Sequence, residues 1–161
     1  MKRYPLALAA LLAGSALQAA TMSSVIYSTD DKHTKLGTVS FEDTAKGLLI
    51  TPVLAGLPAG VHGFHIHQHG NCGAAGMDAG SHFDPAKTDS HLGPEGQGHK
   101  GDLPALTVSA EGTTSGTLLA PHLSTADVKG LAVMVHAGGD NYSNEPPLGG
   151  GGARIGCGVV E

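Results

Sequence analysis

The stretch from Gly63 to Cys72 reads GFHIHQHGNC and alternates apolar side chains with histidines. Side chains of a β-strand alternate between its two faces. The stretch therefore predicts a strand with Phe64 and Ile66 on one face and with His65 and His67 on the other. An isolated His-x-His pair is a polar strand surface as often as it is a metal site, so its meaning depends on the other histidines.

Residues 1–20 predict a secretory signal peptide. A Lys-Arg pair precedes an apolar run too short to span a bilayer as a helix, and small residues surround the expected cleavage point at Ala19 or Ala20. We expect the mature chain, residues 21–161, to be one exported domain that does not insert into a membrane.

The charge balance argues against a nucleic-acid partner. The chain has nine Lys and Arg residues against fourteen Asp and Glu residues. Loss of the two basic residues of the signal peptide changes the net charge from −5 to about −7, and nothing in the sequence forms a basic patch.

The two cysteines, Cys72 and Cys157, are most simply interpreted as one disulfide, because an exported chain matures in an oxidising compartment. A pair of free thiols or a metal-thiolate site is the alternative.

The remaining pattern predicts an all-β domain. Only 124–129, opened by a plausible Ser124 N-cap, indicates a short helical turn. Short β-rich segments separated by turn residues are typical of an antiparallel sandwich or barrel. Eight such strands are expected, at 23–27, 36–42, 48–53, 61–68, 106–110, 115–120, 131–136 and 155–160.

Two long segments interrupt the strands: a first loop, residues 70–104, and a second loop, residues 137–153, which contains the run Gly149 to Gly152. Structureless loops of this length in a small domain are usually functional or disordered. The first loop carries several histidines, which favours a function.

Three histidines are expected on the outside of the strand scaffold. His136 ends the strand at 131–136, whose core face is formed by Leu131, Val133 and Val135, so it should point outward as His65 and His67 do. Three imidazoles that converge in this way suit copper or zinc.

The first loop supplies a second set of ligands. Three histidines and one carboxylate make a closed tetrahedral zinc site, and the loop offers His82, His91, His99 and Asp102. These seven residues suffice for two metals. If one imidazolate were shared, each metal would have four ligands, and His82 lies in the middle of the set.

The sequence resembles the copper-zinc superoxide dismutases, in particular their bacterial periplasmic branch, over essentially the whole mature chain. The matching segments are GFHIHQ at 63–68, SHFDP at 81–85, HLGP at 91–94, GHKGDLP at 98–104, MVHAGGDN at 134–141 and GGARIGCGV at 151–159.

The resemblance implies one copper and one zinc per subunit. Copper would be bound by His65, His67, His82 and His136, and zinc by His82, His91, His99 and Asp102, with His82 as the bridge. It also implies that Asp140 hydrogen-bonds one copper ligand and one zinc ligand, for which His65 and His91 are the candidates, and such a contact fixes ring orientation and tautomer. Arg154 would position the anionic substrate, His82 would also deliver a proton, and Cys72 would pair with Cys157.

The implied fold is an eight-stranded Greek-key barrel or immunoglobulin-like sandwich with two long functional loops. The implied activity is dismutation of superoxide to dioxygen and hydrogen peroxide by a Cu(II)/Cu(I) cycle, which would protect the cell envelope from the periplasm. The subunit would be a monomer or a homodimer. One departure is that the second loop contains no lysine to guide the substrate, and Lys87 and Lys100 are the nearest basic candidates.

Two other functions fit parts of the pattern. A cupin-type dioxygenase or isomerase also carries His-x-His on a β-barrel, but it needs a carboxylate a few residues later, and the first acid after His67 is Asp78. A non-catalytic periplasmic protein that binds copper or zinc needs the ligands but not the bridge, Asp140 or Arg154. These three features together favour an enzyme.

Four histidines have no expected metal role. His62 shares the core-facing parity of Phe64 and is expected to be hydrogen-bonded within the structure. His69 lies at the strand exit, and His33 and His122 lie in turns where we expect them to be solvated.

Overall fold

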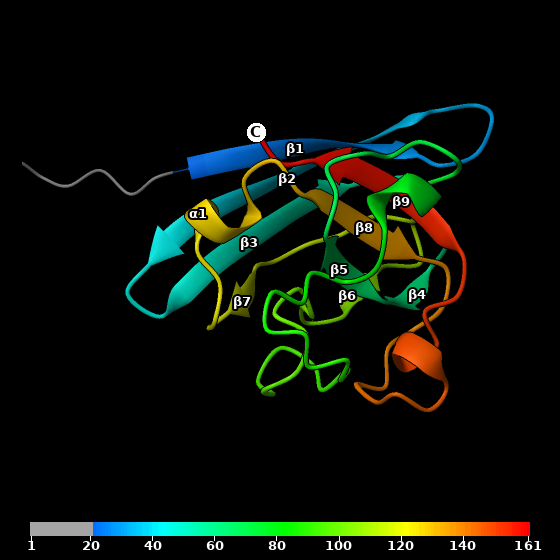
Figure 1. The fold of residues 1–161 in the computed structure, drawn as a ribbon. Coiled ribbons are helices and arrows are strands. Elements are labelled where there is room, and N and C mark those ends of the chain that lie inside the picture. Colours follow the sequence, from blue (N-terminus) through cyan, green and yellow to red (C-terminus); the bar gives the residue numbers. More distant parts are fainter. Residues whose placement is uncertain (1–20) are drawn as a thin grey trace, which may run out of the picture.

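The computed structural model describes residues 21–161, so the predicted signal peptide at 1–20 lies outside the described residues. Residues 21–161 are mainly β-structure, with one short α-helix and two 3₁₀ turns (Figure 1). The elements are β1 (Thr21–Ser28), β2 (Lys35–Thr44), β3 (Gly47–Leu54), β4 (Gly60–His62), β5 (Phe64–His67), η1 (Met77–Ala79), β6 (Leu106–Val108), β7 (Leu118–Ala120), α1 (Thr125–Val128), β8 (Ala132–His136), η2 (Pro147–Gly150) and β9 (Arg154–Val159).

Seven strands form one curled antiparallel sheet in the order β5-β8-β9-β1-β2-β3-β7, and β4 pairs with β6 in a separate ribbon. The all-β class predicted from the sequence is confirmed. The expected strand at 61–68 is two strands, because the chain changes partners at Gly63. Its N–H donates to the carbonyl of Gly138 at 2.7 Å, while β4 pairs with β6 and β5 pairs with β8.

The alternation predicted for β5 is present. Phe64 and Ile66 are fully buried in the main core together with Val133 and Val135 of β8. The opposite face of β8 carries Met134, which packs in a smaller apolar cluster beside the disulfide. This arrangement leaves the histidine face of β5 to be covered by the loops.

Strand β5 lies at the edge of the large sheet, and the first loop pairs with its free backbone groups. Phe83 donates to the carbonyl of Ile66 at 2.8 Å, and Ile66 donates to the carbonyl of Gly101 at 2.9 Å. His82 immediately precedes Phe83, and Asp102 immediately follows Gly101. Each forms an isolated β-bridge with β5, His82 with His67 and Asp102 with His65. Backbone pairing therefore brings both loop residues to the histidine face.

The two loops contact each other, since the backbone N–H of His91 donates to Oδ1 of Asn144 at 2.9 Å. In Figure 1 the second loop and the later part of the first loop extend below the large sheet, while the start of the first loop, with η1, lies beside β9. Cys72 and Cys157 form a disulfide that joins the first loop to β9. At the start of α1, Asp127 accepts at 2.9 Å from the backbone N–H of Ser124, which is the Asp127 half of a capping box with Ser124 as the expected N-cap residue. Among residues 21–161, no helix is long and apolar enough to cross a membrane.

Candidate metal centre

The seven residues predicted as ligands gather beneath the two loops, and all of them are buried. Two groups have ligand atoms that lie within 4.8 Å of one another: His65, His67, His82 and His136, and then His65, His82, His91 and Asp102. His65 and His82 belong to both groups. His99 stands slightly apart, with Nδ1 3.4 Å from Oδ1 of Asp102.

His67 and His136 face each other across the first group. His67 donates from Nδ1 to the carbonyl of Gly80 at 2.9 Å, and His136 donates from Nδ1 to the carbonyl of Gly152 at 3.2 Å. Because a neutral imidazole carries one proton, these bonds leave Nε2 of both rings as acceptors. The two Nε2 atoms are 3.4 Å apart, so two lone pairs point into the same space.

Asp140 holds one histidine of each group. Its two carboxylate oxygens accept from Nε2 of His65 and from Nε2 of His91, each at 2.7 Å. The Nδ1 atoms of both rings are buried and have no hydrogen-bond partner. Gly149 contacts Asp140 so closely that a side chain there would overlap the carboxylate, and its φ of +73° favours glycine as well. The predicted contact of Asp140 with both rings is present.

His82 lies between the two groups. Its Nδ1 is 3.0 Å from Oδ1 of Asp102, while its buried Nε2 has no partner. The Nδ1 atoms of His91 and His99 are also buried without a partner, although that of His91 is only 2.9 Å from Oδ2 of Asp102. Buried nitrogens that converge without hydrogen bonds fit metal coordination, because they would otherwise be unsatisfied.

The electrostatics of the first group also suit a metal. Burial lowers the pKa of His65 to about 3, that of His67 to about 2 and that of His136 to about 4, so these rings are neutral at physiological pH. Burial likewise lowers the pKa of His82. Neutral imidazole is the form that binds metal.

The second group contains the charges. Burial raises the pKa of the two carboxyl groups, but hydrogen bonds from the histidines outweigh it and hold the pKa of Asp102 and of Asp140 well below the usual range. Burial also opposes a charge on His91, yet its contacts with both carboxylates raise its pKa to about 9. Two carboxylates near four imidazoles suit a divalent cation.

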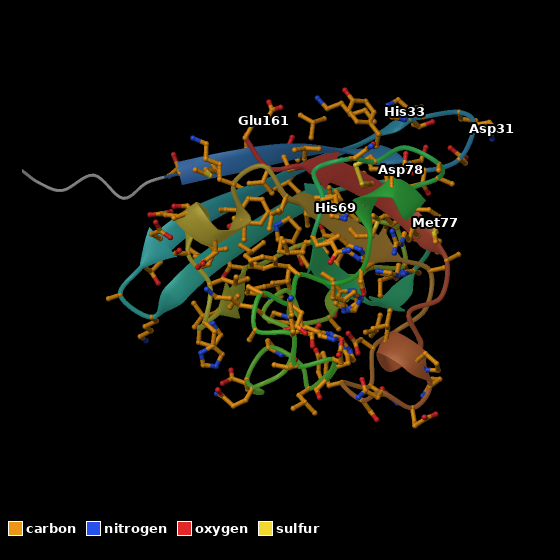
Figure 2. The ribbon with its side chains drawn as sticks, viewed as in Figure 1. Asp31, His33, His69, Met77, Asp78 and Glu161 are labelled. Carbon is orange, nitrogen blue, oxygen red and sulfur yellow. A yellow bond between two sulfur atoms is a disulfide. The ribbon has the colours of Figure 1, made fainter. Side chains whose placement is uncertain are left out.

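Arg154 begins β9 beside the first group. It donates from Nη1 to the carbonyl of Gly76 at 2.5 Å and from Nη2 to the carbonyl of Gly80 at 2.6 Å. The arginine, His136 and the exposed Met77 line a surface depression of about 230 Å³. In Figure 2, Met77 extends from η1 toward the outside of the molecule. The depression thus joins solvent, a cationic group and one histidine of the first group.

Comparison with known proteins identifies the family. The copper/zinc superoxide dismutase (SODC) family matches residues 35–160. The chain belongs to this family. It is 51% identical to the copper-zinc superoxide dismutase of Legionella pneumophila over 140 residues, 87% of this chain and 86% of that protein. It is 44% identical to the Escherichia coli K12 enzyme over 100% of both chains.

Solved superoxide dismutase structures have the same fold. The enzyme from Brucella abortus aligns with a TM-score of 0.83 and 42% identity, over 88% of this chain and 100% of that one. The monomeric enzyme from Salmonella enterica aligns with a TM-score of 0.77 and 45% identity over the same shares. The curled β-sheet is therefore the superoxide dismutase fold.

The protein is thus a copper-zinc superoxide dismutase, an oxidoreductase whose substrate is superoxide. The histidine group fits copper, the histidine-aspartate group fits zinc, and His65 and His82 belong to both groups. Family membership favours the enzyme over the non-catalytic metal-binding alternative and over a cupin.

The histidines expected to have no metal role lie outside both groups. His62 is buried, with its ring nitrogens each 2.8 Å from a carbonyl oxygen, those of His136 and Pro58. His33, His69 and His122 are exposed.

Sequence reasoning missed three features of the centre. Lys100, considered as a guide for superoxide, pairs instead with Asp127 at 2.6 Å. The carbonyls of Gly76 and Gly80 that hold Arg154, and Met77 at the rim of the depression, have no pattern in the sequence that would reveal them.

Proposed function

We propose that His82 is the residue that bridges the two metals. His65 also belongs to both groups, but its Nε2 donates to Asp140, so a single ring nitrogen is left for a metal. His82 also contacts a carboxylate, through Nδ1 and Asp102, but Asp102 is itself a member of the second group, whereas Asp140 belongs to neither group, and Nε2 of His82 has no partner. Copper would then be held by His65, His67, His82 and His136, and zinc by His82, His91, His99 and Asp102.

The metals and Arg154 have separate tasks. Bound copper would supply a one-electron redox couple, and bound zinc would supply a fixed positive charge that keeps the bridging ring in place. Arg154 binds superoxide at the rim of the depression that His136 lines. Two unit charges 5 Å apart at an effective dielectric constant of 20 attract by about 3.3 kcal/mol, enough to offset locally the negative charge of the chain.

His82 is also the proposed proton carrier. Its Nε2 is buried without a hydrogen-bond partner, in a ring whose centroid lies 5.1 Å from that of His67, and this nitrogen can hold a proton whenever it is not acting as a ligand. Nδ1 stays beside Asp102, which keeps the ring oriented. The two catalytic residues of this proposal are therefore Arg154, which binds superoxide, and His82, which carries the proton.

We propose that the enzyme acts in the periplasm and protects the cell envelope from superoxide. The signal-peptide pattern of residues 1–20, the disulfide and the similarity to bacterial enzymes support export. We expect a monomer or a homodimer, and the Salmonella relative is named as monomeric.

The observation that carries this assignment is the set of buried ring nitrogens without hydrogen-bond partners on His65, His82 and His99, together with the contact of Nδ1 of His91 with Asp102. The test is His82→Ala, which should abolish the spectroscopic coupling of the two metals and most superoxide consumption. His69→Ala is the matched control, because His69 is exposed and lies two residues beyond His67. If metal content and coupling survive in His82→Ala, the bridge is another residue.

A further inference from the structure

A cavity of about 230 Å³ opens on the zinc side of the centre, away from Arg154. Its wall includes His99 and Asp102 from the first loop, and His122 from the turn between β7 and α1 also lines it. His99 is 8% exposed, more than any other of the seven proposed ligands. Two zinc ligands therefore border a space that reaches the surface.

The charges around this cavity suit a cation. Besides the histidines, its charged lining residues are Asp102 and Lys100, and Lys100 pairs with Asp127 at 2.6 Å. The ammonium is thus compensated, and the buried carboxylate of Asp102 is the remaining negative charge along the wall. The depression on the copper side has the opposite character, because Arg154 lines it and repels cations.

His122 is placed to meet an ion first. It is exposed, whereas His82 and His91 are 1% and 0% exposed. A neutral imidazole binds zinc readily, and a ligand that binds weakly can pass the ion on. Three potential zinc-binding side chains line the cavity and come from two separate segments of the chain: His99 and Asp102 from the first loop, and His122 from the turn before α1.

We propose that zinc reaches its site through this cavity and that His122 is the residue that captures it. The proposal rests on the zinc ligands assigned above, and it adds a site outside them. His122 would affect the rate of zinc uptake but not the amount of zinc bound at equilibrium. Superoxide would reach the centre from the other side, by way of Arg154.

The test measures the rate at which metal-free protein takes up zinc from a zinc-loaded chromophoric chelator at neutral pH. His122→Gln should slow uptake by about threefold or more, because it removes a ligand that concentrates zinc at the cavity. The final zinc content should equal that of the wild type. His33→Gln is the matched control, since His33 is exposed at the β1–β2 turn, far from α1 and β7 (Figure 2).

A second variant tests the charge argument. Asp127→Asn leaves the ammonium of Lys100 uncompensated at the cavity, so zinc uptake should slow at low salt, and the difference should shrink as salt is added. An unchanged rate in His122→Gln with normal final zinc content overturns the proposal, as does equal slowing in His33→Gln. Failure of the ligand assignment would look different, because His91→Ala would then still bind a full equivalent of zinc.

Discussion

His67 and Arg154 hydrogen-bond to the same atom, the carbonyl oxygen of Gly80, at 2.9 and 2.6 Å. One residue is a proposed copper ligand and the other is the proposed anion-binding group. By accepting from Nδ1 of His67, the Gly80 carbonyl fixes the tautomer of the imidazole. By accepting from Nη2 of Arg154, it also fixes the position of that end of the guanidinium. The position of the substrate-binding charge is therefore tied to the position of the metal ligand by a single peptide group.

Replacing Arg154 tests this relationship. Arg154→Glu should lower kcat/KM for superoxide by about a hundredfold or more, because it substitutes repulsion for local attraction, while copper and zinc content stay normal. Arg154→Lys should give an intermediate value, since one ammonium keeps the charge but lacks the planar fork that reaches both Gly76 and Gly80. Unchanged superoxide consumption in Arg154→Glu would remove the arginine from the mechanism.

Asp140→Asn should weaken metal binding. An amide has one acceptor oxygen, so it cannot accept from both His65 and His91 as the carboxylate does. We expect the affinity for copper or zinc to fall by about 10- to 100-fold, the range found for groups that orient metal-binding histidines. Competition with chelators measures this. Asp31→Asn, at an exposed position in the β1–β2 turn, is the control and should leave both affinities unchanged (Figure 2).

The sequence was informative about the centre because the strand period of two places residues reliably. His65 and His67 had to share a face opposite Phe64 and Ile66, and the structure has them so. The all-β class followed from the same kind of pattern. Family motifs then pointed to the loop residues, which periodicity cannot place.

The contacts made by the loops could not be derived from the sequence. The pairing of Phe83 and Gly101 with Ile66 depends on β5 being an edge strand, which is a property of the sheet order. The sequence places Gly63 inside a single predicted strand, but the strand divides there because the Gly63 N–H pairs with the carbonyl of Gly138, which is distant in sequence. The pairing of Lys100 with Asp127 likewise joins residues that are distant in sequence.

Loss of the disulfide should destabilise the protein substantially. Cys72 and Cys157 are 85 residues apart, and closing a loop of that length is worth about 4.6 kcal/mol in the chain-entropy estimate, with observed values commonly about 2 to 4 kcal/mol. The Cys72→Ser/Cys157→Ser double variant should lose a free energy of unfolding in this range, measured by urea denaturation of the metal-free protein. A loss below about 1 kcal/mol would mean that the crosslink constrains the unfolded chain very little.

Zinc binding should release a proton at neutral pH, and His91 should be its source. Contacts with Asp102 and Asp140 raise the pKa of His91 to about 9 in the metal-free protein, so the ring is protonated there and must lose a proton from Nδ1 to act as a ligand. The charged ring contributes stability to the metal-free fold fully below its ordinary pKa of 6.5, and this contribution is lost as the pH rises through about 9. Calorimetry in two buffers of different ionisation enthalpy should therefore give about one proton per zinc at neutral pH and progressively less above pH 9. Asp140→Asn should reduce the release, because it removes one of the carboxylates that favour the charged ring. A release near zero for the wild type at neutral pH would show that His91 is already neutral before zinc binds.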